Sequence, residues 1–175
     1  TSWMKKKPQP GAAAGDPDPV SMNERDLPWP QAAYHPDGRL MTKSERRALA
    51  DRDPEWFAKI YLAVHFDREW APFHKDWAGE MRQLRPEGVS TRERIGRKIA
   101  KACFRGSAKS TNWSFLYPLH GICTGLDPFI LLISATMPLA RLLLTRVKVE
   151  LEISPLLHHD YGYLVPQNSR TSVAR

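Results

Sequence analysis

Residues 103–111 read Cys-Phe-Arg-Gly-Ser-Ala-Lys-Ser-Thr, which brings cationic side chains, hydroxyl groups and a glycine into one short stretch. A loop that holds the phosphates of a nucleotide needs backbone N–H groups at a helix N-terminus, a Lys for the terminal phosphates and a neighbouring hydroxyl for Mg²⁺. Lys109-Ser110-Thr111 meets the second half of that requirement. The full G-x-x-x-x-G-K-[ST] spacing fails, because Cys103 and Ala108 occupy the two glycine positions.

The elements expected around this stretch favour a phosphate loop over a generic basic turn. A short strand is expected over 98–104, and a helix from Lys109 toward Tyr117, where Pro118 kinks or ends it. The continuous apolar run 129–133 predicts a strand that is buried on both faces of a parallel sheet. A long helix capped by Thr136 follows, so the order strand, helix, strand, helix predicts an α/β fold.

Three helices are expected before the loop, and they form a helical N-terminal layer. Thr42 and Glu45 make a capping box for a short charged helix, Asp53-Pro54 begins a second helix, and a third begins near Pro72. The second helix is expected to have an apolar face formed by Trp56, Phe57, Ile60, Tyr61 and Val64, and the third helix one formed by Phe73, Trp77, Met81 and Leu84. The apolar face expected for the helix after Thr136 is formed by Leu139, Leu142, Leu143, Val147 and Leu151.

The composition defines the broad class of protein. The chain of 175 residues is long enough for one sizeable core, and a Pro- and Gly-rich start predicts a disordered or extended tail over 1–40 before a single domain at 41–175. Lys and Arg total 26 against 19 Asp and Glu, and the net charge of +7 favours polyanionic partners. Two cysteines, no secretion signal and no apolar run of membrane-spanning length predict a soluble cytoplasmic protein without a membrane partner.

Six short motifs follow one another across about residues 56–162. They are residues 73–77, 105–111, 119–122, 130–136, 149–152 and 160–162. In this order and spacing the sequence resembles the N-terminal ATPase region of large terminase subunits, the motors that package DNA into tailed-phage capsids. That family tolerates a loop that begins with Arg and has Ala before the Lys. The resemblance therefore implies that the missing glycines are a family variant and that the loop still binds phosphate.

The resemblance implies a P-loop NTPase fold of the RecA-like type, a parallel sheet flanked by helices, with ATP and Mg²⁺ as cofactors. It implies contacts from Lys109 to the β- and γ-phosphates, from Ser110 to Mg²⁺, and from Arg105 to the γ-phosphate. Lys109 and Arg105 are the expected catalytic residues. The nucleotide-binding residues that it implies are Arg105, Gly106, Ser107, Ala108, Lys109, Ser110, Thr111 and, at the adenine end, His74.

An aromatic side chain such as Phe73 could also stack on adenine. However, Phe73 belongs to the apolar stripe of its helix, so core packing is the commoner explanation.

The same resemblance implies a homo-oligomeric ring that acts on double-stranded DNA with a portal protein and a small terminase subunit, in the cytoplasm of the host cell. ATP hydrolysis in this class needs an apolar strand that ends in Asp and usually Glu. The run 129–133 ends instead in Ser134-Ala135-Thr136. We therefore expect the Walker B strand and the nuclease domain to lie downstream, and this chain, as a truncated or partial product, to hydrolyse ATP weakly or not at all by itself.

Two other functions remain open at this stage. One is a basic nucleic-acid-binding module with a degenerate phosphate loop, and the other is a different helicase-like P-loop ATPase. Nine Lys or Arg residues between Arg82 and Lys109, against Glu87 and Glu93, suit either a DNA-contacting surface or a solvated face. The adjacent His158-His159-Asp160 favours a packing or surface role over a metal site.

Overall fold

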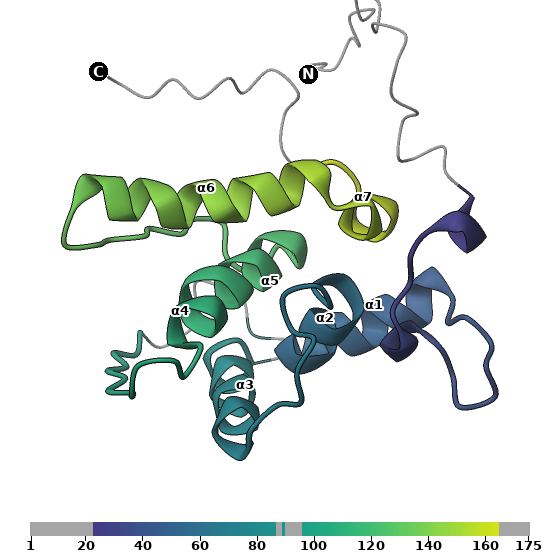
Figure 1. Ribbon diagram of the computed structural model, residues 1–175, viewed down its shortest axis with the longest axis horizontal. Coiled ribbons are helices and arrows are strands. Elements are labelled where there is room, and N and C mark those ends of the chain that lie inside the picture. Colours follow the sequence, from purple (N-terminus) through teal and green to yellow (C-terminus); the bar gives the residue numbers. More distant parts are fainter. Residues whose placement is uncertain (1–22, 87–88, 90–95, 165–175) are drawn as a thin grey trace, which may run out of the picture.

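The computed structural model describes residues 23–86, 89 and 96–164, and within these ranges it is helical, with no strand and no sheet. The one β-type feature of the described residues is an isolated antiparallel bridge between Tyr34 and Leu40. The predicted α/β fold, a RecA-like P-loop NTPase with a parallel sheet flanked by helices, is therefore wrong for this structure. Its helices pack directly on one another instead (Figure 1).

The predicted helical layer before the loop is confirmed, with starts set by local capping. Helix α1 spans Lys43–Arg52, α2 spans Pro54–Tyr61 and α3 spans Pro72–Leu84. The backbone N–H of Thr42 donates to the Glu45 carboxylate at 2.7 Å, and the Thr42 hydroxyl accepts from the Glu45 N–H at 3.4 Å. Asp53 accepts from the Glu55 N–H at 2.9 Å, which caps α2 as expected.

The helical path that begins at Lys109 is longer than the sequence predicted. It runs through α4 (Lys109–Thr111), a π-helical turn η3 (Asn112–Leu116) and α5 (Tyr117–Cys123). Pro118 lacks an N–H, and its ring crowds the carbonyl one turn earlier, so a regular helix would kink or end there. The wider π turn lies directly before Pro118, and the helix continues past the proline instead of ending.

In Figure 1, helix α6 (Met137–Ile153) lies along the top of the coloured part of the ribbon, above α4 and α5, and α7 (Pro155–Tyr161) follows it after a sharp turn. Val147 and Leu151 of the predicted apolar face are buried, whereas Leu139 and Leu142 are exposed. No helix among the described residues combines the length and the apolar character needed to cross a membrane.

The hydrophobic core lies where α2 meets α1, α3 and α5, and α6 covers it through η3 and α5. Phe57 is fully buried, with its ring centroid 5.3 Å from those of Tyr61 and His120. The largest apolar side chains that are almost completely buried are Phe57, Ile60, Leu62, Met81, Phe115, Leu116, Leu119 and Leu157. Val64, which was expected on the apolar face of α2, lies beyond the end of that helix and is 90% exposed.

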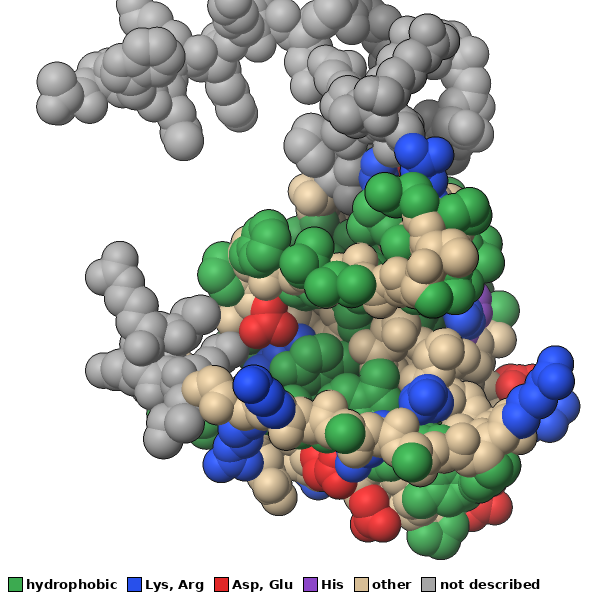
Figure 2. All heavy atoms as spheres, turned by 90° about the vertical axis from the view of Figure 1, so that its left-hand side faces the viewer, with side chains coloured by type: hydrophobic (Ala, Val, Ile, Leu, Met, Phe, Trp, Pro, Cys, Tyr) green, Lys and Arg blue, Asp and Glu red, His purple; other side chains and the backbone are tan. Residues whose placement is uncertain are grey.

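The two predicted strands are not strands in this structure. Residues 98–103 and 129–133 lack any assigned secondary structure. A β-strand exists only when a neighbour accepts and donates its backbone hydrogen bonds, and no described residue does so for either segment. Phe129, Leu131 and Ile133 are exposed rather than buried, and hydrophobic side chains gather over the upper part of the face shown in Figure 2.

Residues 23–40 are the described part of the expected tail, and they pack on the helices. They contain two 3₁₀ turns, η1 (Glu24–Asp26) and η2 (Gln31–Ala33), and bury Leu27, Trp29 and Ala33. The indole Nε1 of Trp29 donates to the Glu24 carbonyl at 2.8 Å. Residues 1–22 lie outside the described part of the chain.

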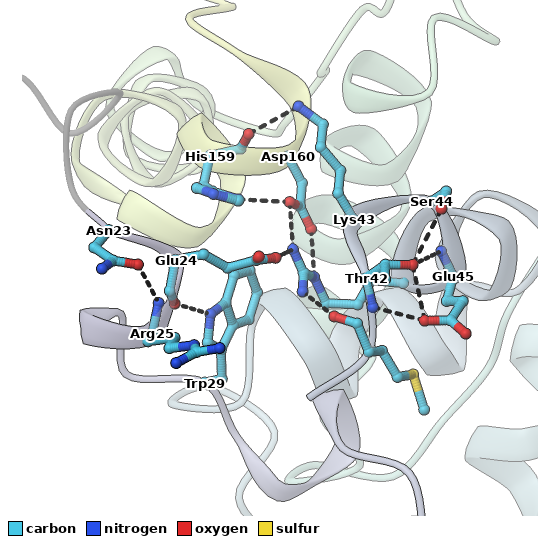
Figure 3. A network of polar contacts seen from close by, with 12 residues as sticks. Asn23, Glu24, Arg25, Trp29, Thr42, Lys43, Ser44, Glu45, His159 and Asp160 are labelled. Carbon is cyan, nitrogen blue, oxygen red and sulfur yellow. Dashed lines mark hydrogen bonds and ion pairs between the residues drawn. The ribbon is translucent and has the colours of Figure 1, made fainter. Parts of the chain in front are cut away.

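A buried ion pair joins α1 to α7 and to this N-terminal segment (Figure 3). The guanidinium of Arg46 donates to both carboxylate oxygens of Asp160 at 2.8 Å and to Glu24 at 2.7 Å. The Tyr61 hydroxyl donates to Asp160 at 2.7 Å, and His159 Nδ1 lies 2.7 Å from the same carboxylate. Asp160 therefore has a packing role within a hydrogen-bonded network.

A second buried polar cluster lies between α3 and α5. Arg85 donates to Asp127 at 2.9 Å and to the Tyr117 carbonyl at 2.9 Å, and its Nη1 lies 2.9 Å from Nδ1 of His120. Nε2 of His120 lies 3.0 Å from the Ala50 carbonyl, so the neutral ring donates there and accepts from Arg85. Burial, together with the positive charge of Arg85, lowers the pKa of His120 to about 4.

Candidate anion-binding loop

Residues 104–111 form a compact turn that leads into a helix. The Ser107 N–H donates to the Phe104 carbonyl at 3.3 Å, which closes the turn. Gly106 has φ +88°, and Ala108 has φ +56°, the only positive φ of a non-glycine residue in the described ranges. Ser107 between them has no such positive φ, so left-handed and ordinary backbone conformations alternate through the loop.

Alternation of this kind turns successive N–H groups toward one concave side, the arrangement called a nest, which binds anions. No described residue accepts a hydrogen bond from the backbone N–H groups of residues 105, 106, 108, 109 and 110. These donors are therefore free for solvent or for a ligand. A phosphate oxygen is an acceptor that suits such a set of N–H groups.

Cationic and hydroxyl side chains surround these free donors. Arg105, Lys109 and Ser110 are exposed and Thr111 is half-buried. Neither Arg105 nor Lys109 forms an ion pair with any residue that the structure describes. The Asn112 N–H donates to the Ala108 carbonyl at 3.0 Å, which fixes the first turn of the helical path just after the loop.

His74 is the one predicted nucleotide-binding residue that comes from outside the loop, and the structure does bring it to the loop. Its Nε2 lies 3.0 Å from the Ser107 carbonyl, and its Nδ1 accepts from the Ala71 N–H at 3.3 Å. Both ring nitrogens are thus engaged within the protein. The adenine contact that the resemblance implies for His74 remains a prediction.

The aromatic residues near His74 pack against each other and against the loop. The Phe73 ring lies 5.3 Å from Trp77 and 5.8 Å from Phe104, and Trp70 is buried and stacked on Phe66 at 5.5 Å. Sequence reasoning missed the contact between Phe73 and Phe104, because no local signal pairs two residues so far apart along the chain. The start of α3 therefore forms one wall of the loop.

Within the described part of the chain, no metal centre is placed to complete this site. In the described ranges no group of three or more His, Cys, Asp or Glu residues is placed to hold a metal ion. Carboxylates are the usual protein ligands of Mg²⁺. The role of Ser110 as a Mg²⁺ ligand remains a prediction.

A separate cavity of about 1000 Å³ lies between α1, α2, α3 and α5, and no residue of 104–111 lines it. Two of the charged side chains on its wall, Asp53 and Arg82, pair with each other at 2.5 Å. His120 and Arg85, which also line the cavity, belong to the buried cluster described above. The candidate loop is therefore an exposed surface site.

Comparison with known proteins adds no relative: no family model, no curated protein and no solved structure matches this chain. The likeness to terminases thus stays a prediction based on short motifs. The candidate site rests on the backbone geometry and the charges of the loop itself.

The left-handed conformation of Ala108 yields a stability prediction. An L-residue with a Cβ is disfavoured there by roughly 1–2 kcal/mol, whereas glycine is not. We expect Ala108→Gly to raise the free energy of unfolding by about 0.5–1 kcal/mol, measured by urea denaturation. The matched control is Ala48→Gly on the exposed side of α1, which should lower it by about 1 kcal/mol. Equal losses for both variants would contradict the left-handed assignment.

Proposed function

We propose that residues 105–111 bind the phosphates of ATP and that the chain is the nucleotide-binding part of a motor of the terminase large-subunit type, which packages double-stranded DNA. The observation that carries the proposal is the alternation of Gly106 and Ala108 in left-handed conformations directly before a helix that begins at Lys109. It leaves a row of N–H groups that no described residue accepts, beside two cations that form no ion pair within the described part of the chain.

Each side chain has a distinct role in this proposal. The Lys109 ammonium contacts the β- and γ-phosphates as a mobile point charge, and the planar guanidinium of Arg105 pairs with γ-phosphate oxygens. Ser110 offers its hydroxyl to Mg²⁺, and Thr111 supports the α-phosphate side. No Asp or Glu occurs within 103–111, so the loop itself binds phosphate but supplies no carboxylate to orient an attacking water.

The partners in this proposal follow from the motif resemblance. They are double-stranded DNA, a portal protein, a small terminase subunit and further copies of the same chain. The proposal depends on the loop and on the helix that follows it, and it requires no sheet within the described residues. Helix N-termini and nests bind phosphate through local backbone N–H groups.

A second candidate, a basic nucleic-acid-binding module, is supported by the exposed side chains that precede the loop. Arg97 and Lys98 are exposed and lie on the same stretch of chain as Arg105 and Lys109. Each Lys or Arg that meets a DNA phosphate adds to affinity and to its salt dependence. In this alternative the loop N–H groups contact the DNA backbone instead of a nucleotide.

Lys109→Ala separates the two candidates. If the loop holds ATP, the variant should bind Mg-ATP at least about tenfold more weakly in a calorimetric titration, because one charge-assisted contact contributes 1.5–3 kcal/mol. Its affinity for double-stranded DNA should stay within about twofold of the parent. Lys148→Ala on α6 is the control for the loss of one charge and should change neither value. Unchanged Mg-ATP behaviour with weakened DNA binding would favour the basic module.

A further inference from the structure

The contact between His74 and Ser107 links two elements that are 33 residues apart in the chain. The Ser107 side of the loop is turned inward: this residue is 4% exposed, whereas Gly106 and Ala108 on either side of it are exposed. The inward carbonyl lies 3.0 Å from Nε2 of His74. Nδ1 of the same ring accepts from the Ala71 N–H, so the Nε2–H tautomer satisfies both contacts at once.

This hydrogen bond fixes the direction of a donor on the other side of the loop. A peptide unit is planar, and in the trans form its C=O and N–H point in opposite directions. The described residues contain no cis peptide bond. Because the Ser107 carbonyl points to His74, the N–H of Ala108 points away from α3, toward a side where none of the described residues accepts from it.

The imidazole is itself held in place. Its ring centroid lies 4.2 Å from Phe73, 5.5 Å from Trp77 and 6.1 Å from Trp70. With its Nδ1 accepting from the first turn of α3, the ring has little freedom to rotate. His74 is therefore a rigid donor on a helix, the kind of support that keeps a binding loop in one geometry.

We propose that His74 is a positioning residue for the anion-binding loop: it holds the Ser107–Ala108 peptide so that the Ala108 N–H faces the bound phosphate. The inference rests on the proposed function, and it assigns His74 to the phosphate end of the site. Loss of the Nε2 donor lets this peptide rotate, which removes an N–H from the concave side before the ligand arrives. The cost therefore appears as weaker phosphate binding.

Three substitutions at His74 separate the two hydrogen bonds. His74→Gln keeps a donor at about the reach of Nε2, His74→Asn keeps an acceptor near Nδ1 but cannot reach Ser107, and His74→Ala has neither. We expect His74→Asn and His74→Ala to weaken Mg-ATP binding about tenfold, and His74→Gln to stay within about threefold of the parent. Thermal unfolding of His74→Asn checks that the variant remains folded.

A second readout does not depend on nucleotide. Tryptic cleavage after Arg105 and Lys109, followed by mass spectrometry, should be several-fold faster in His74→Asn and His74→Ala than in the parent and in His74→Gln. Cleavage rates that are the same in all four proteins would overturn the positioning role. Equal Mg-ATP affinity in His74→Asn and the parent would overturn it as well.

The two proposals fail in different ways. If the parent chain binds no Mg-ATP while tryptic cleavage still depends on the Nε2 donor, the proposed function fails, but the role of His74 in holding the loop stands. If the parent binds Mg-ATP and the His74 variants match it in both measurements, the function stands and the positioning role is excluded.

Discussion

Replacing Asp160 by Ala should lower the free energy of unfolding by about 3–5 kcal/mol, because it leaves the buried guanidinium of Arg46 without its main counter-charge. Both partners are fully buried, and two hydrogen bonds of 2.8 Å join them. Urea denaturation followed by tryptophan fluorescence measures the loss. A decrease below about 1 kcal/mol would show that Glu24 alone can compensate Arg46.

Two controls define the origin of that loss. Replacing both partners by apolar residues, as in Arg46→Met with Asp160→Leu, should recover most of the stability, since no unpaired charge then remains buried. Lys59→Ala removes a half-exposed i,i+4 pair with Glu55 and should cost about 0.5 kcal/mol or less. If the loss of unfolding free energy is large for the buried pair and small for the half-exposed pair, it arises from leaving a buried charge unpaired and not from the loss of one contact.

Stability should also fall steadily as the pH is lowered from about 6.5 to about 4, on account of His120. The folded protein keeps this ring neutral, with its pKa lowered to about 4 by burial and by the charge of Arg85, whereas an exposed His titrates near 6.5. Between these two pH values His120 is protonated in the unfolded chain but not in the folded protein, so protonation stabilises the unfolded state relative to the folded state. The loss should reach on the order of 2–3 kcal/mol near pH 4.

Urea denaturation at several pH values, for the parent and for His120→Gln, tests this assignment. The variant cannot titrate at this position and should show a flatter profile between pH 6.5 and 4. Asp160 acts in a different window. Burial alone would raise the pKa of its carboxyl, but the hydrogen bonds from Arg46 and Tyr61 outweigh burial and hold that pKa below its usual value, so its contribution to stability is lost only at still lower pH.

Helix starts could be predicted from the sequence because their causes are local. The reciprocal bonds of Thr42 and Glu45 and the cap by Asp53 involve residues two or three positions apart. Helix α7 was not predicted, although Ser154-Pro155 is a plausible helix start. In the structure His158 is buried and its Nε2 lies 2.6 Å from the Leu151 carbonyl of α6.

The two strands could not be predicted correctly because an extended run says nothing about its partner. Apolar residues over 129–133 suit a buried strand, a buried helix segment or an unpaired edge, and only tertiary contacts decide among these. In the loop, too, some features could be predicted from the sequence and others could not. The motif predicted that a helix begins at Lys109. The left-handed conformation of Ala108 and the hydrogen bond between Ser107 and His74 depend instead on how the start of α3 packs against the loop.

The π turn sets the rotational phase between the loop and the core. In a regular α-helix, residues eleven positions apart are about three turns apart and point the same way, so Lys109 and His120 would share one side. The structure instead has Lys109 exposed and His120 almost fully buried. The wider turn over Asn112–Leu116 offsets the two ends by roughly a quarter of a turn, so converting these residues to a regular α-helix, with none deleted, would turn either the cation inward or the imidazole outward.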